Sequence, residues 1–368
     1  MVNNNVARRA FLALTMAAAA GLVVMTAGGA RAVAGEEVVV GTLGGTLEAA
    51  MKKHFYEPFT KQTGITVVLV PVDRAKLLAS VEAGEPEMDV ANLSGGQMSM
   101  WTSRNALEPI DYSAFDKETL AGIPAYLKHE YGVGALIYSI GMAYSTVDFP
   151  ADNPRPQTWQ EFWDVAKFPG PRGLAGCGDR LMSGGTLEFA TLADGAALDA
   201  LYPIDIDKAF DKIKELKPSV GKFWQEGAEA PQALINGELS VSPSFNGRIY
   251  TAHQQGAPVD WNWNQSLLQY DYWVVPKASP NAVNAMKLLA FISRGGPQAG
   301  FATETSFGPI NTEAYKGIPG DLAKWLPGSP ENQPRQIVQN YDWWNAQAGN
   351  GKTNLENALD ACVSALAQ

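Results

Sequence analysis

Gly351-Lys352-Thr353 has the residue order that ends a phosphate-binding loop. That loop also requires an earlier glycine, at the position that Ala346 occupies, and it should follow a strand, whereas this segment follows Trp343-Trp344. The chain contains no Gly-x-Ser-x-Gly and no His-Glu-x-x-His sequence. These residues therefore give no basis for nucleotide or hydrolytic chemistry, and we expect a protein that is not an enzyme.

The cysteines and histidines are few. Neither the three histidines nor the two cysteines show the spacing of metal ligands, so we expect no metal and no other cofactor. Cys177 and Cys362 could form a disulfide if the chain is exported to an oxidising compartment, which the N-terminal residues described next indicate. Two buried free thiols are the alternative.

The first 34 residues are typical of a secretory signal peptide. Arg8-Arg9 precedes an apolar run from Phe11 to Ala30, and Ala-x-Ala sites follow at 30–32 and 32–34. The string from Arg8 to Leu12 resembles a twin-arginine signal. A membrane anchor is the alternative, but the run is marginal in length and a cleavage site ends it. We expect a periplasmic protein cleaved near Ala32 or Ala34.

Composition limits the partners. The chain has 368 residues and a formal net charge of -10, and removal of a segment with three arginines and no acids leaves -13. An acidic surface argues against nucleic acid and anionic membranes. The length predicts two domains. Ten tryptophans is a high number, and aromatic side chains often line ligand sites.

The first part of the chain has an alternating strand and helix pattern. Strands are predicted at 38–40, 66–70 and 88–91, with helices over 47–59 and 73–83, and Gly64 suits the end of the first helix. This order indicates a parallel sheet covered by helices. Ligands bind outside the carboxyl ends of such strands, where Gly44-Gly45 and Ser94-Gly95-Gly96 lie.

A second unit is predicted to begin near Ala143-Tyr144. The apolar run 133–144 is long enough to cross between two lobes. Thr158 and Glu161 fit a capping box at a helix start, and a further helix is predicted over 207–216. Segments 239–242 and 272–275 read as strands. Ser183-Gly184-Gly185-Thr186 precedes a plausible helix, whose free N–H groups could bind an anion.

Five segments resemble the extracellular solute-binding proteins of ABC importers, in particular the spermidine/putrescine type. They occur in the order of that family across nearly the whole chain after the signal: 59–65 (FTKQTGI), 158–164 (TWQEFWD), 245–248 (FNGR), 270–276 (YDYWVVP) and 307–311 (FGPIN).

The resemblance implies the type II periplasmic-binding-protein fold, with two α/β lobes and a hinge. The first lobe would comprise residues 36–142 and 275–322, and the second 143–274 and 323–368. The lobes would close over a ligand about a hinge near Tyr144 and Pro276. The implied partners are a small amine or amino acid and the permease subunits of an importer, and the chain is expected to be a monomer. A disulfide within the second lobe is also expected, because the C-terminal helices of the family return to it.

The resemblance also implies site residues. Asp271 matches an acid that holds a ligand ammonium in polyamine-binding relatives, and Phe245 and Phe307 match aromatics of the cleft. The family pattern is not fully kept: Gln269 replaces a tryptophan, acids are missing after the first strand, and Arg248 replaces a small neutral residue. The site has lost negative charges and gained a positive one.

These residues predict a ligand with both an ammonium and a carboxylate, such as 4-aminobutyrate. Arg248 would bind the carboxylate, because its planar guanidinium matches that group. The remaining predicted contacts come from the glycine-rich turns and from aromatic side chains, namely Ser94, Gly95, Gly96, Ser183, Thr186, Trp263 and Trp273.

Other readings remain open. Arg248 and Asp271 could pair with each other, or Arg248 could be a surface residue without a role in binding. The runner-up ligand is a polyamine such as putrescine or spermidine, which needs a second acid, for which Asp179 is a candidate. A secreted hydrolase on a similar frame and a sensor without transport are the alternative functions.

Overall fold

The computed structural model describes residues 37–42 and 44–366. The predicted signal peptide, 1–34, lies outside these residues. None of the helices described is long and apolar enough to cross a membrane.

The described residues form ten strands and sixteen α-helices. The strands are β1 (Glu37–Thr42), β2 (Thr66–Pro71), β3 (Ala91–Ser94), β4 (Lys128–His129), β5 (Gly132–Ser145), β6 (Arg172–Ala175), β7 (Val220–Trp224), β8 (Val241–Phe245), β9 (Val259–Val274) and β10 (Gln336–Val338). The helices are α1 (Gly45–Met51), α2 (Glu57–Thr63), α3 (Arg74–Glu82), α4 (Gly95–Ser103), α5 (Lys117–Gly122), α6 (Trp159–Trp163), α7 (Arg180–Ser183), α8 (Thr186–Ala193), α9 (Ile206–Leu216), α10 (Glu229–Ile235), α11 (Asn246–Gln254), α12 (Ala282–Ile292), α13 (Gly295–Thr305), α14 (Gly320–Ala323), α15 (Tyr341–Asn345) and α16 (Asn354–Leu366).

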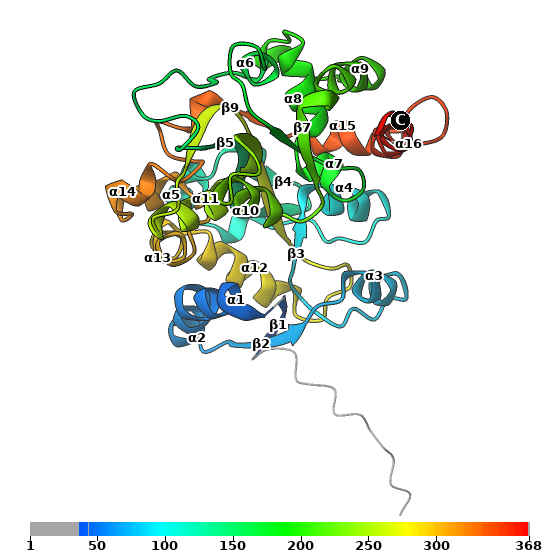
Figure 1. Cartoon of the computed structure of the whole chain (residues 1–368). Helices are drawn as coiled ribbons and strands as arrows, with labels where there is room; N and C mark the ends of the chain where they lie inside the picture. Colours follow the sequence, from blue (N-terminus) through cyan, green and yellow to red (C-terminus); the bar gives the residue numbers. More distant parts are fainter. Residues whose placement is uncertain (1–36, 43, 367–368) are drawn as a thin grey trace, which may run out of the picture. The chain divides into compact units, whose positions relative to one another are not determined.

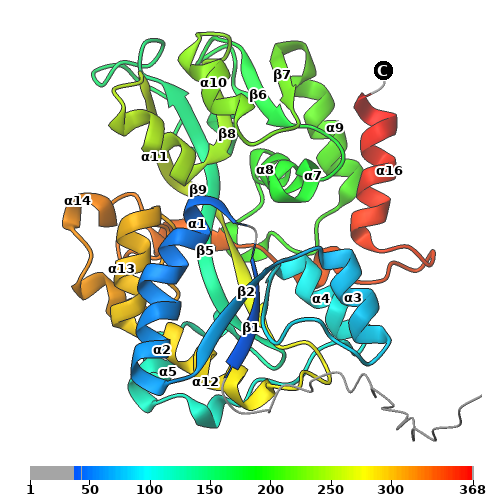
Figure 2. The same ribbon diagram turned by 90° about the horizontal axis from the view of Figure 1, so that it is seen from below.

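Two long antiparallel strands, β5 and β9, are the spine of the fold. They belong to an eight-stranded sheet with the order β10-β9-β5-β8-β6-β7, in which β3 also pairs with β9 and β4 with β5. Figure 2 shows β5 and β9 running from a lower group of elements around β1, β2 and α12 to an upper group around β6, β7 and β8. We call these groups the first lobe and the second lobe.

Separate apolar cores support the two lobes. One cluster of buried side chains draws on segments 38–137 and 268–310 and on Tyr341, and another draws on 140–241, Leu267 and 337–365. Tyr138 and Tyr270 on the two long strands pack on the first core, whereas Ile140 and Leu267 belong to the second. The strands therefore pass from one core to the other within a few residues. Figure 1 shows the two paired strands near the middle of the fold.

Several predicted elements are confirmed. Strands β1 and β2 are parallel neighbours, and Gly64 ends α2 with a φ of 76°, a conformation that glycine adopts without strain. Asp73 caps α3 by accepting from the amides of Ala75 and Lys76. The Thr158 side chain accepts from the Glu161 amide and caps α6. The second half of that capping box is absent, because the Glu161 carboxylate accepts instead from the amide of Gln157.

The third strand differs from its prediction. The segment expected at 88–91 touches β1 through one parallel bridge, between Val40 and Val90. The regular strand, β3, begins only at Ala91 and runs antiparallel to β9. The chain therefore leaves the small parallel sheet at this point and joins the large sheet. Strand β9 is also much longer than the segment 272–275 predicted for it.

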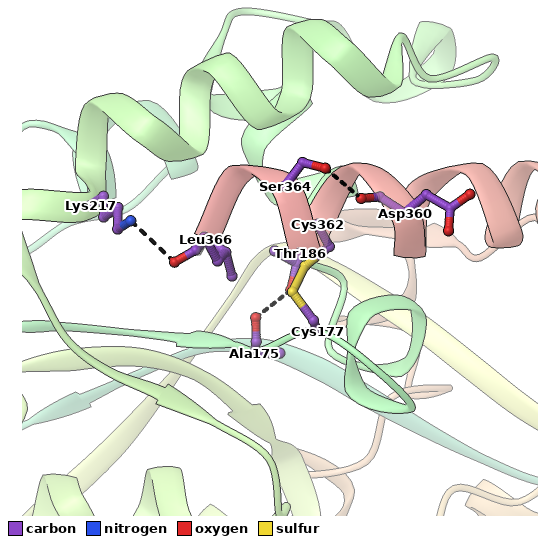
Figure 3. Close-up of a disulfide and its surroundings, with 8 residues drawn as sticks. All are labelled: Ala175, Cys177, Thr186, Lys217, Asp360, Cys362, Ser364 and Leu366. Atoms are coloured by element: carbon purple, nitrogen blue, oxygen red, sulfur yellow. Dashed lines mark hydrogen bonds between the residues drawn. A yellow bond between two sulfur atoms is a disulfide. The ribbon is translucent and has the colours of Figure 1, made fainter. Parts of the chain in front are cut away.

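The predicted disulfide between Cys177 and Cys362 is present, with the two Cα atoms 5.8 Å apart. It ties α16 to the loop after β6, as Figure 3 shows. The alternative prediction, in which both cysteines are free thiols, is therefore wrong. Helix α16 also packs along α9, and the Nζ atom of Lys217 donates to the Leu366 carbonyl.

Candidate ligand-binding cleft

A cleft with a volume of about 620 Å³ lies where the two long strands pass between the lobes. Both lobes contribute side chains to it. Its lining consists of Thr46, Leu47, Asn92, Leu136, Tyr138, Arg180, Gly227, Phe245, Asn246, Gly247, Arg248, Thr251, Asp271, Thr305, Ser306 and Phe307. Four predicted site residues are in this set: Phe245, Arg248, Asp271 and Phe307.

The pairing of the strands places the residues at the centre of the cleft next to one another. Asp271 on β9 lies between Leu136 on β5 and Ser94 on β3. Phe245, at the end of β8, pairs with Ile140 of β5. Side chains alternate along a strand, so Leu136 and Tyr138 both emerge toward the cleft. One short stretch of sheet therefore supplies an acid and aromatic rings.

Three aromatic rings form an apolar wall. The ring centroids of Tyr138 and Phe245 are 6.1 Å apart, and those of Tyr138 and Phe307 are 6.3 Å apart. Phe307 is held by two backbone hydrogen bonds between its neighbour Gly308 and Ile137 of β5, at 3.1 and 2.8 Å. Such a wall suits the methylene groups of a ligand, and ring faces also attract an ammonium group.

Helix α11 begins at the cleft. Asn246 is buried and locks this start in place, because its Oδ1 accepts from the Ser139 amide at 2.9 Å and its Nδ2 donates to the Trp325 carbonyl at 3.0 Å. No side chain caps the helix. The first-turn amides of Gly247 and Arg248, which have no partner within the helix, therefore reinforce the positive charge of Arg248.

Arg180 is a second cation at the cleft. Its Nε donates to the Gln225 carbonyl at 2.9 Å, and its Nη2 lies 3.2 Å from the Glu226 carboxylate. Glu226 is largely exposed, so water screens its charge. The second-lobe wall of the cleft thus presents two guanidinium groups.

Asp271 is the one acid among the lining residues that the structure describes. Burial raises the pKa of its carboxyl to about 7, although the positive charge of Arg74 and the hydroxyl of Tyr138 act in the opposite direction. A carboxylate in this position is poorly solvated. A cationic group from a ligand would stabilise the charged form of Asp271.

Arg248 and Asp271 do not pair with each other. Within the described part of the chain, neither forms an ion pair with any residue. The structure therefore does not show the alternative in which the two charges neutralise one another. It does show Arg248 as an exposed residue, as the other alternative expected, although its side chain also lines the cleft. Both charges are available to a ligand.

Three other predicted residues lie outside the lining of this cleft, at the start of α4. Ser94 caps that helix through a 3.3 Å hydrogen bond from the Gln97 amide. Gly95 borders a different cavity of about 270 Å³ and packs so tightly that a Cβ would come within 2.1 Å of the Tyr341 ring. Gly96 packs against Met182. The glycines thus serve close packing at this position.

The predicted anion site at the start of α8 is also outside the cleft. The Thr186 hydroxyl is buried and donates to the Ala175 carbonyl, and the Ser183 hydroxyl donates to the Asp179 carbonyl. Trp263 is buried and donates to the Lys324 carbonyl. Gln269 is buried and donates to the Ser183 carbonyl. Hydrogen bonds within the chain therefore occupy the Ser183 and Thr186 hydroxyls that were predicted to bind a ligand.

Trp273 is fully buried and lies beside the cleft instead of in its wall. It lines a small adjoining cavity together with Asn92, which borders both spaces.

Sequence reasoning missed Tyr138, Arg180 and Asn92. A polar-tipped aromatic in the middle of the apolar run 133–144 was a signal for Tyr138. Arg180 lies just before the glycine-rich turn at 183–186, so a search for the carboxylate partner could have included it. Asn92 gave no signal apart from its place between a strand and Ser94.

The fold and the cleft define a two-lobed solute receptor, and comparison with known proteins agrees. A family model described as bacterial extracellular solute-binding protein matches residues 54–327, so the chain belongs to this family. The resemblance inferred from the sequence is thereby confirmed. The chain is accordingly a substrate-binding protein of the ABC-transporter type.

Individual relatives are similar over most of the chain. A gamma-aminobutyric acid-binding protein of Pseudomonas aeruginosa is 30% identical over 84% of this chain and 87% of its own length. The crystal structure of an ABC transporter substrate-binding protein from Bradyrhizobium japonicum is 32% identical, with a TM-score of 0.78 over 90% of this chain and 100% of that chain. The structure of a GABA receptor is 30% identical, with a TM-score of 0.75 over 90% of this chain and 97% of that chain.

Proposed function

We propose that this protein captures a zwitterionic ω-amino acid, such as 4-aminobutyrate, in the periplasm and delivers it to the permease subunits of an ABC importer. The observation that carries the proposal is that Arg248 and Asp271 line one cleft without forming an ion pair. A ligand with a carboxylate and an ammonium would satisfy both charges.

The parts of the cleft match the parts of such a ligand. The carboxylate would lie at the start of α11, where Arg248, Arg180 and the free amides gather. The ammonium would lie at Asp271, and the methylenes against Tyr138 and Phe245. Two relatives named for binding gamma-aminobutyric acid support the same ligand class.

The lining favours this ligand over a polyamine. A linear polyamine needs an acid at each end, but Asp271 is the one acid among the lining residues that the structure describes. Asp179, the candidate for a second acid, is not among them. Two arginines would repel a second ammonium.

The alternative function, that of a secreted hydrolase, has less support from the cleft. Among the described lining residues there are hydroxyl groups but no histidine to act as a base. We further propose that the protein acts as a monomer with residues 36–142 and 275–322 in the first lobe and 143–274 and 323–368 in the second, after removal of the signal at 1–34.

Titration calorimetry with 4-aminobutyrate, putrescine and spermidine tests the ligand class. Arg248→Ala and Asp271→Ala should each weaken 4-aminobutyrate binding by about 2–5 kcal/mol, because each leaves one charge of the bound ligand without its partner. Arg104→Ala and Asp321→Ala are matched controls, since both side chains lie on the exposed surface. Tight putrescine binding that is indifferent to Arg248→Ala, with no 4-aminobutyrate binding, would contradict the proposal.

A further inference from the structure

The cleft adjoins a small cavity of about 30 Å³ in the first lobe. Leu47 and Asn92 line both spaces, and Trp273 and Arg74 are among the other residues that line the smaller one. We propose that this cavity is a second carboxylate subsite, so that the preferred ligand carries a carboxylate on the same carbon as its ammonium group. This inference rests on the proposed function and narrows its ligand class.

Two residues that line this cavity carry buried hydrogen-bond donors without a partner. Trp273 is 1% exposed, and neither its Nε1 nor the buried Nδ2 of Asn92 has an acceptor within residues 37–42 and 44–366. Buried donors are almost always paired in native proteins, so two together indicate an acceptor from outside the chain. The volume is enough for one such group or one water molecule.

Arg74 gives the cavity its charge. One of its five N–H groups is used, since Nε donates to the Asn92 carbonyl at 3.1 Å. Glu48 also lines the cavity, but Lys52 lies 2.8 Å from its carboxylate and the Thr42 hydroxyl donates to it at 2.9 Å. The remaining positive charge of Arg74 favours an anionic acceptor over a neutral one.

The strand register sets the distance between the subsites. Asp271 and Trp273 emerge from the same face of β9, and their partners on β3 are Ser94 and Asn92. Residues two apart on a strand are about 7 Å apart. An ammonium group that binds Asp271 and a carboxylate that binds Trp273 can therefore be attached to the same carbon atom of a ligand. L-Glutamate is 4-aminobutyrate with one added carboxylate on that carbon, so the two compounds are a matched pair of probes.

Titration calorimetry of both probes with the mature protein tests the subsite. The unaltered protein should bind L-glutamate at least about tenfold more tightly than 4-aminobutyrate, the usual gain from hydrogen bonds to a charged group. Asn92→Leu and Trp273→Phe should each reduce this ratio several-fold, because each removes one donor and keeps most of the side-chain volume. Arg74→Met should abolish the preference.

Trp261→Phe is the matched control. Trp261 is also a buried tryptophan of β9 whose Nε1 has no acceptor among the described residues, but it packs in a second-lobe cluster away from the cavity. The Trp261→Phe substitution should leave the ratio of the affinities for L-glutamate and 4-aminobutyrate unchanged.

The outcomes separate the two proposals. If Arg248→Ala and Asp271→Ala weaken 4-aminobutyrate binding but L-glutamate binds no better, the subsite is wrong and the cavity holds only water. The subsite proposal is also wrong if the protein still prefers L-glutamate after each of the three substitutions Asn92→Leu, Trp273→Phe and Arg74→Met. If neither probe binds at millimolar concentration, the proposed function fails, and the subsite fails with it.

Discussion

Asp271 shows how one partly buried carboxyl can contribute to binding while it lowers the stability of the fold. Its raised pKa means that the folded protein holds a proton more tightly than the unfolded chain does. The native state therefore binds more protons between about pH 4 and pH 7, and the free energy of unfolding falls as the pH rises through this window.

Asp271→Asn should remove this dependence. Without ligand, the variant and the parent should be equally stable near about pH 4, and the variant should be more stable by roughly 1–3 kcal/mol above about pH 7, where the parent carries a half-buried charge. Urea denaturation at a series of pH values measures the difference. A variant that is less stable than the parent above pH 7 would contradict this account.

The same titration affects the ligand. An ammonium group binds the charged form of Asp271, so affinity for 4-aminobutyrate should weaken as the pH falls below about 7. The binding of Asp271→Asn should be weak at every pH.

Four of the sixteen residues in the described lining of the cleft could be predicted from the sequence. Phe245, Arg248, Asp271 and Phe307 were found because they occur in segments that resemble the family. Ser183 and Thr186 were chosen because a glycine-rich turn before a helix can bind anions, and nothing in the sequence revealed that Ala175 and Asp179 already accept their hydroxyl hydrogens. A sequence pattern does not say which carbonyl oxygen lies within hydrogen-bond distance of a given hydroxyl.

Among the elements, helices were easier to predict than long strands. Helix α9 has polar and apolar faces, and Asp205 caps it, so its pattern is complete within the sequence. Strand β9 is a mixture of polar and aromatic residues from Val259 onward, and no apolar run marks its start. Gln265 interrupts it with a φ of 59°, and its side chain accepts from the Trp159 amide at 2.8 Å. The role of that residue depends on a contact with α6 more than a hundred positions away.

Glu188 makes the same point for α8. A glutamate in an apolar helix would be expected at the surface, but it is fully buried. Its Oε1 accepts from the Tyr202 hydroxyl, the Gln339 amide and the Trp344 indole, at 2.8, 3.1 and 2.8 Å. It therefore fastens the returning C-terminal segment to the second lobe, and burial raises the pKa of its carboxyl.

The disulfide fastens the last helix, α16, to the same lobe. Replacement of both cysteines by serine should lower the free energy of unfolding by about 2–5 kcal/mol, because the bond closes a long loop and limits the unfolded chain. Denaturant unfolding of the oxidised parent and the double variant gives the value. Reduction should destabilise the parent by a similar amount and leave the double variant unaffected, and equal stability of all forms would refute the prediction.

At the scale of the whole molecule, few connections join the lobes. The strands β5 and β9 pass from one core to the other at 138–140 and 267–270. The predicted hinge positions lie a few residues from these points, at Tyr144 near the end of β5 and at Pro276 just after β9. A ligand that contacts Arg248 from one lobe and Asn92 from the other binds the closed form better than the open form, and it shifts the equilibrium toward closure.

Small-angle scattering should therefore show a smaller radius of gyration for the mature protein with saturating 4-aminobutyrate than without it. The apparent mass should be that of one chain in both states. Asp271→Ala, which should bind weakly, is the control and should show no change. Identical curves for the parent with and without bound ligand would count against closure.

The division of each core between distant segments also has a consequence for synthesis. The second-lobe core contains Phe162 and Leu187 from the middle of the chain, but also Trp344 and Cys362 from its end. A ribosome releases these last residues only when translation is complete. The second lobe therefore cannot complete its folding before translation ends. Until then its apolar side chains remain exposed and accessible to chaperones.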